Sequence, residues 1–174
     1  MYRSPFEAYP FLCDDGADLR CDFELATDRL SSAIGLLRAQ TPELAEELLW
    51  VGELVYHANA TLRTRLTVTQ AEIDRLRART EALRALAGGR CHRFVQPQGS
   101  ARACLAHLLR VDCKSLVRLI YRYDQAGGAA PEALIDFVNL LSGYFFFLAL
   151  YLNELDGVDE VDFVSRNYPA PGGD

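Results

Sequence analysis

The 174-residue sequence has almost no lysine, no disulfide framework and no stretch that alternates polar and apolar residues over the length of a strand. Without that alternation a half-buried β-sheet is excluded, because successive side chains of a strand point to opposite faces. The five cysteines, an odd number without framework spacing, exclude a disulfide-stapled secreted fold and indicate reduced thiols. The first ten residues also lack the apolar core of a signal peptide, so a cytoplasmic protein is expected.

The charge is acidic overall but basic in the middle of the chain. A net charge of −6 argues against nucleic acid as a partner, since general nucleic-acid binding depends on neutralising phosphates. Between Thr61 and Arg122, however, thirteen residues are basic and four are acidic, and the single lysine, Lys114, lies in this stretch. A basic middle in an acidic protein can hold a small anion, with scattered solvated arginines as the alternative explanation.

A long apolar stretch near the C-terminus is interrupted too often to cross a membrane. Residues 134–152 are apolar almost all the way round a helix, but polar residues or glycine occur at Asp136, Asn139, Ser142 and Gly143. The unbroken run, 144–152, is too short for a bilayer. We therefore expect no membrane partner, but a central helix buried by its neighbours or by other subunits.

Apolar periodicity and capping signals predict an all-α protein. Five helices are expected, over about residues 22–39, 41–66, 69–88, 99–126 and 131–153. They form a five-helix bundle over residues 21–155. An irregular N-terminal segment, 1–20, precedes it, and an acidic tail, 156–174, follows.

The stretch from Phe94 to Arg118 is the most informative part of the sequence. His107, Arg110, Lys114 and Arg118 follow one another at spacings of three and four, which places them on one face of a helix. An aromatic residue and a turn precede this basic stripe, so the stretch can hold an anionic ligand. The alternative is an ordinary bundle helix with a solvated basic face.

Two positions near the stripe call for a structural explanation. Asp112 interrupts the apolar face of the same helix, where a buried carboxylate needs a partner or a raised pKa. Cys91 and His92 could bind a metal, but adjacent ligands lack the usual spacing, so no metal site is expected.

Four blocks of the sequence resemble the PduO-type ATP:corrinoid adenosyltransferases. The blocks are TDRLSSAIG (27–35), FVQPQGS (94–100), the helix from His107 to Arg118, and VNLLSG (138–143) with the following Phe146. The resemblance covers about residues 22–155. It implies a trimer-forming helical bundle that transfers the adenosyl group of ATP to cobalt(I) of a corrinoid such as cobalamin and releases triphosphate.

The resemblance also implies roles for individual residues. Phe94 would close the lower face of the corrin, while Asp28 and Arg110 would form an ion pair across the subunit interface; these three are the expected catalytic positions. The expected cofactor-binding positions are Phe94, Phe146, Asn139, His107, Lys114 and Arg118. Lys114 and Arg118 would contact the phosphates of ATP, with Mg²⁺ if ATP binds.

The sequence departs from the family pattern mainly on the ATP side. The family's threonine-rich N-terminal phosphate loop has only Asp14-Asp15-Gly16 as a possible remnant. The arginine-rich motif of the fourth helix has Ser115 and Val117 in place of an arginine and a glutamate. Leu140 and Gly143 replace an arginine and an aspartate of the central helix.

Three hypotheses follow from the match and the departures. The first is an adenosyltransferase that acts as a homotrimer, with an adenosylcobalamin-dependent enzyme as possible acceptor of its product. The second is a non-catalytic corrinoid- or tetrapyrrole-binding homologue that has lost the ATP site. The third is a helical trimer that binds neither ligand.

Overall fold

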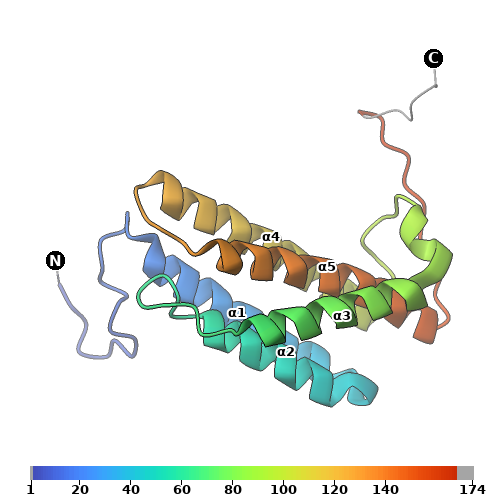
Figure 1. The fold of residues 1–174 in the computed structure, drawn as a ribbon, viewed down its shortest axis with the longest axis horizontal. Coiled ribbons are helices and arrows are strands. Elements are labelled where there is room, and N and C mark those ends of the chain that lie inside the picture. Colours follow the sequence, from blue (N-terminus) through green and yellow to red (C-terminus); the bar gives the residue numbers. More distant parts are fainter. Residues whose placement is uncertain (1, 168–174) are drawn as a thin grey trace.

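The computed structural model describes residues 2–167, and its five α-helices lie side by side in an elongated bundle (Figure 1). The helices are α1 (Leu19–Ala39), α2 (Ala45–Ala58), α3 (Gln70–Ala87), α4 (Ala101–Gln125) and α5 (Glu132–Leu155). Two short 3₁₀ helices, Pro42–Leu44 and Gly88–His92, precede α2 and follow α3. Within the described residues the β-structure is a single bridge between Val95 and Asp162. The prediction of an all-α bundle is confirmed, whereas residues 168–174 of the expected tail lie outside the described residues.

Three helices, α1, α3 and α4, begin after residues whose side chains cap them. Asp18 accepts a hydrogen bond from the Arg20 amide, and α1 therefore begins before the expected position. Thr69 and Glu72 form the capping box of α3. Ser100 accepts from the Ala103 amide and starts α4. These local signals are readable in the sequence, so the starts of α3 and α4 agree with the prediction.

The second helix is shorter than predicted. The sequence suggested one helix to about residue 66, but α2 ends at Ala58 and turns occupy the residues before Thr69. The side-chain amide of Asn59 donates to Glu24 O and Thr27 Oγ1, both at 2.7 Å, and so ties this end of α2 to α1. Thr67 Oγ1 donates to the His57 carbonyl at 2.8 Å. Side chains that bond the backbone in this way compete with continued helix.

Helix α5 is the central element of the bundle. It packs against α4 and α3, while α1 packs against α2 and α4. Phe137, Tyr144, Phe145 and Leu148 are completely buried on α5. The Tyr144 hydroxyl is satisfied, because it donates to Glu47 Oε1 at 2.7 Å. The expectation of a central helix covered by its neighbours is confirmed.

By length and composition α5 could also cross a membrane, since its most apolar window has a mean hydropathy of 1.8. The buried core helix of a soluble protein meets the same criterion, and 56% of that window is buried inside the bundle.

Candidate functional site

An open pocket of about 420 Å³ lies where the loop before α4 meets α4 and α5. It brings together four of the residues that the sequence nominated: Phe94, Arg110, Lys114 and Phe146. The other lining residues are Arg93, Val95, Ser142, Gly143 and Phe147. Three aromatic rings and three cationic side chains therefore face one cavity, which suits a large, mostly apolar ligand with polar groups at its edge.

His107 lies beside this pocket and is buried, so it does not belong to a solvated basic face, whereas Lys114 and Arg118 of the same stripe are exposed. Its ring centroid is 6.4 Å from that of Phe146, and only 3% of the residue is exposed. Leu108 is exposed instead, at 62%. Because α4 packs against both α1 and α5, its buried arc differs in position from the one that the apolar pattern alone indicates.

Buried polar atoms without partners surround the pocket. Among the described residues, neither ring nitrogen of His107 nor Nε of Arg110 has a hydrogen-bond partner. The Arg110 guanidinium lies 5.9 Å from the centroid of the Phe146 ring. Burial, followed by the positive charge of Arg110, lowers the pKa of His107 to about 4. Buried polar groups without partners are costly. A ligand or another subunit that formed hydrogen bonds with these groups would remove that cost.

The low pKa of His107 predicts a loss of stability in mild acid. The pKa of His107 falls from 6.5 in the unfolded chain to about 4 in the folded chain, so folding favours the neutral imidazole over the protonated one. The free energy of unfolding therefore has its full value above pH 6.5 and decreases as the pH falls towards 4. Between pH 7 and pH 5 the loss is about 2 kcal/mol.

Urea unfolding of the ligand-free protein at these two pH values measures the loss. The variant His107→Phe should show a smaller pH dependence, whereas His57→Gln, which alters an exposed histidine on α2, should match the parent. Equal pH dependence in His107→Phe and the parent would contradict the prediction.

The remaining nominated residues lie outside the pocket lining. Asp28 and Arg118 are exposed on α1 and α4. Asn139 is also exposed, and its side-chain amide donates to the Ile135 carbonyl of its own helix at 2.9 Å. In the described part of the chain Asp28 forms no ion pair with Arg110. A single copy of the chain therefore does not assemble all eight nominated residues.

Asp112, whose partner the sequence left unnamed, lies at the contact between α4 and α1. Its carboxylate is 3.5 Å from Arg29 Nη2 and its side chain is 26% exposed. Partial exposure and an arginine partner together explain how a carboxylate is tolerated on the apolar side of α4.

Phe94 is held at the rim of the pocket by a segment that sequence reasoning missed. Phe94 is 71% exposed, and the centroid of its ring lies 5.5 Å from that of Phe163. The Phe163 amide donates to the Phe94 carbonyl at 2.9 Å, and the Gln96 amide donates to Val161 O at 2.8 Å. The sequence predicted only an acidic tail here, and the one signal of this contact is that acidic residues lie opposite the arginines before Phe94.

The turn between Phe94 and α4 requires glycine at one position. Gly99 has φ +145°, and a Cβ there would overlap the side-chain amide of Asn153. That amide is completely buried, accepts from the Ser100 amide at 2.9 Å and donates to Gln98 O at 3.2 Å. Asn153 therefore fixes the loop to the end of α5.

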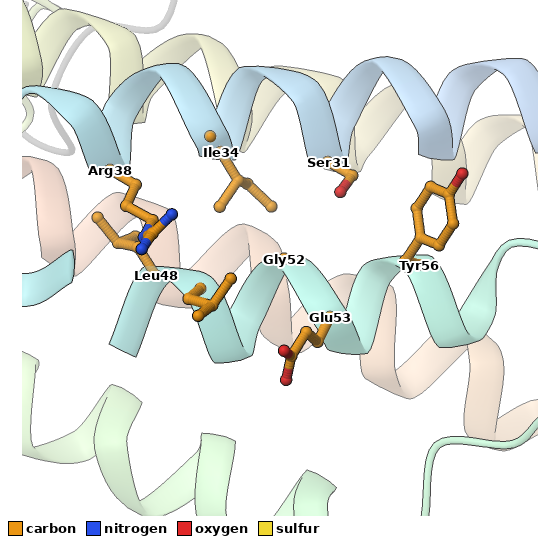
Figure 2. Close-up of a pocket in the computed structure, with 9 residues that line it drawn as sticks. Ser31, Ile34, Arg38, Leu48, Gly52, Glu53 and Tyr56 are labelled. Atoms are coloured by element: carbon orange, nitrogen blue, oxygen red, sulfur yellow. The ribbon is translucent and has the colours of Figure 1, made fainter. Parts of the chain in front are cut away.

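A second pocket, of about 310 Å³, lies between α1 and α2 (Figure 2). Its lining includes Ile34, Leu48 and Tyr56, and the small residues Gly35 and Gly52 leave the groove open. The pocket holds none of the nominated residues. It lacks the cluster of three cations that distinguishes the pocket beside Phe94.

Residues 16–152 of this chain match the sequence profile of the cobalamin adenosyltransferase family. The chain belongs to this family. It is similar to a corrinoid adenosyltransferase of Bacillus subtilis (strain 168), with 26% identity over 160 residues that cover 86% of this chain and 82% of the relative. The family inferred from the four sequence blocks is confirmed.

Solved structures of the family share the fold. A phenylalanine-to-alanine variant of the PduO-type ATP:corrinoid adenosyltransferase from Lactobacillus reuteri, complexed with cobalamin and ATP, has a TM-score of 0.75 and 20% identity, covering 85% of this chain and 87% of that one. An arginine-to-lysine variant complexed with ATP has a TM-score of 0.73 and 22% identity, covering 84% and 87%. These likenesses establish the adenosyltransferase bundle for this chain.

The N-terminal segment, where the resemblance suggested a remnant of a phosphate loop, is attached to the bundle through Arg63. Asp14 Oδ2 is 3.1 Å from Arg63 Nη2, and Glu24 Oε1 accepts from Arg63 Nε at 2.7 Å. Tyr9 donates from its hydroxyl to Glu24 Oε2 at 2.6 Å. Asp14, in the possible remnant of the loop, is therefore already paired. The N-terminal segment lies at the opposite end of the bundle from the segment before α4 (Figure 1).

Proposed function

We propose that this chain transfers the adenosyl group of ATP to the cobalt of a corrinoid, which binds in the pocket beside Phe94. The observation that carries the proposal is the meeting of Phe94, Arg110, Lys114 and Phe146 in one cavity. In the proposed reaction a cobalt–carbon bond forms at the 5′ carbon of the ribose. The bond from that carbon to the triphosphate oxygen breaks, and triphosphate leaves with the electron pair.

The pocket fits the chemistry of a corrinoid. Phe94, Phe146 and Phe147 offer apolar surface to a flat macrocycle, and the cations can meet its amide oxygens and phosphate. Phe94 is exposed enough to lie against the ring and exclude an axial ligand from the cobalt. The protein would then supply orientation and exclusion of water, while the cofactor supplies the nucleophile.

The phosphates of ATP would be held on the outer face of α4. Lys114 and Arg118 are one turn apart and exposed, so both can reach a polyphosphate, with Mg²⁺ as counter-ion. Ser115 and Val117, which stand where the family has an arginine and a glutamate, are uncharged and offer no charged contact to ATP. A hydrogen bond to a charged group is worth about 1.5–3 kcal/mol, so two missing contacts weaken ATP binding by about a hundredfold or more.

A homotrimer would complete the site. Helices α1 and α4 pack together and both expose apolar residues: Leu25, Leu36, Leu108 and Val111. Such a face favours contact with another copy. Asp28 of one copy would then pair with Arg110 of the next.

Asp28→Ala should shift the sedimentation coefficient towards that of a monomer, and a variant that stays in the parent's assembly would count against the pairing.

The proposed compartment is the cytoplasm. All five cysteines are free thiols, as expected of a reducing environment. An adenosylcobalamin-dependent enzyme is the proposed acceptor of the product.

Separate titrations with ATP and cob(II)alamin, followed by turnover under strong reduction, test the proposed function. We expect a change in the cob(II)alamin spectrum on binding, and corrinoid-dependent release of triphosphate with formation of a cobalt–carbon bond. Arg110→Met should lose most of this activity. Arg77→Met, at an exposed arginine on α3, should retain it. No turnover by the parent chain with a strong reductant would overturn the enzymatic proposal.

A non-catalytic corrinoid binder is the second candidate, favoured by the altered residues on the ATP side. It predicts the same spectral change with cob(II)alamin but no effect of ATP on the spectrum or the affinity. ATP-dependent formation of the cobalt–carbon bond would exclude it.

A further inference from the structure

The segment after α5 turns back and covers the loop that carries Phe94. Two backbone hydrogen bonds, from Gln96 to Val161 and from Phe163 to Phe94, join the two strands of chain in an antiparallel bridge. Arg90 Nη1 also donates to Val158 O at 2.9 Å. The position of Phe94 therefore depends on the segment 158–163, which lies close to it only in the folded chain.

A completely buried carboxylate attaches this segment. The side chain of Glu160 is 0% exposed, and its Oε2 lies 2.7 Å from Arg90 Nη1 and 3.6 Å from Arg93 Nη2. Its Oε1 accepts from Asn153 Nδ2 at 3.3 Å. Asn153 in turn bonds Gln98 and Ser100, so one network joins the tail, α5 and the loop before α4. A buried charge with several partners fixes a geometry, because leaving it unpaired is costly.

The other acidic partners of Arg90 are exposed. Glu154 Oε2 is 2.6 Å from Arg90 Nη2 with a side chain 53% exposed, and Asp159 Oδ1 is 3.5 Å away with a side chain 94% exposed. Solvated pairs of this kind contribute little. Glu160 is therefore the carboxylate that holds the tail segment.

We propose that Glu160 is a positioning residue for the pocket: through Arg90 and Asn153 it holds the tail segment 158–163 against the Phe94 loop and so sets the position of the Phe94 ring. The proposal rests on the proposed corrinoid site for its effect on ligand binding. The attachment itself is a property of the free protein. Glu160 does not line the pocket, so it acts on the ligand through residues that do: Phe94 and its own ion-pair partner Arg93.

The test compares Glu160→Gln with Glu154→Gln, which makes the same change at an exposed partner of the same arginine. In the free protein, hydrogen exchange at the Gln96 and Phe163 amides should be at least about tenfold faster in Glu160→Gln than in the parent, equivalent to about 1.4 kcal/mol. Glu154→Gln should exchange like the parent. Cob(II)alamin should bind Glu160→Gln about tenfold more weakly and with a smaller spectral change, while the affinity for ATP stays the same.

Unchanged exchange at the two amides would overturn the attachment, whatever the protein binds. Faster exchange with unchanged cob(II)alamin affinity and spectrum would overturn the positioning role. If the parent binds no corrinoid, the proposed function and the positioning role both fail, while the exchange result still decides the attachment. Phe163→Ala keeps the Glu160 ion pairs and removes the ring against Phe94. It should reproduce the spectral change, with circular dichroism confirming an intact bundle.

Discussion

Phe94→Ala is expected to slow corrinoid-dependent adenosyl transfer by about a hundredfold, equivalent to about 2.7 kcal/mol in the activation free energy. In the proposed site the ring lies against the corrin and keeps an axial ligand away from cobalt, and alanine leaves that space open to water. The free energy of unfolding should change by less than about 0.5 kcal/mol, because the ring is 71% exposed and outside the core. A large effect on activity without an effect on stability is the signature of a ligand-contacting residue.

Turnover, the cob(II)alamin spectrum and urea unfolding measure these quantities on one preparation. Tyr56→Ala is the matched control, since Tyr56 is an aromatic residue, 62% exposed, in the pocket between α1 and α2 (Figure 2). It should leave turnover and spectrum unchanged. If the two variants lose equal activity, the pocket beside Phe94 is not the corrinoid site.

Glu24→Ala is expected to destabilise the protein by about 3 kcal/mol, because it removes one partner of a buried ion pair. Glu24 is 4% exposed, and its carboxylate pairs with Arg63 and accepts from the Tyr9 hydroxyl. Its removal leaves Arg63 with Asp14 as its remaining carboxylate partner. The Tyr9 hydroxyl donates to Glu24, and burial together with this hydrogen bond raises the pKa of Tyr9.

Urea unfolding at pH 7 measures the loss, and limited proteolysis reports release of the residues before α1. Asp74→Ala is the control, because it removes one partner of the exposed ion pair with Arg77. An exposed pair contributes about 0–1 kcal/mol, so this variant should be close to the parent. Losses of the same size in the two variants would show that the Glu24–Arg63 pair contributes no more than a surface pair.

Features set by neighbouring residues could be predicted from the sequence. The capping box at Thr69 and Glu72, the N-cap at Ser100 and the apolar run of α5 each depend on side chains within a few turns of one another. They gave the helix number and most boundaries. The end of α2 was predicted wrongly, because Asn59 bonds α1 there, and that contact joins residues distant in the sequence.

Part of the candidate site could also be predicted, because some of its residues lie in local blocks of the sequence. Phe94, Arg110, Lys114 and Phe146 came from sequence blocks and meet in the pocket. Phe163 could not be found in this way, since no local pattern tells which tail residue will pack on Phe94. The roles of all eight nominated residues stay predictions, and Asp28, Asn139 and Arg118 lie outside the pocket of a single chain.

The sequence by itself determined the all-α class, the starts of α3 and α4 and the family, because caps, apolar periodicity and motif blocks are local properties of the chain. Only the tertiary structure decided that His107 is buried beside Phe146 and that Glu160 attaches the tail to the Phe94 loop. Burial and ion pairing depend on which distant segments pack together. The energies of burial and ion pairing depend on the removal of water at those contacts. The residue pattern of a single helix does not record which contacts will form.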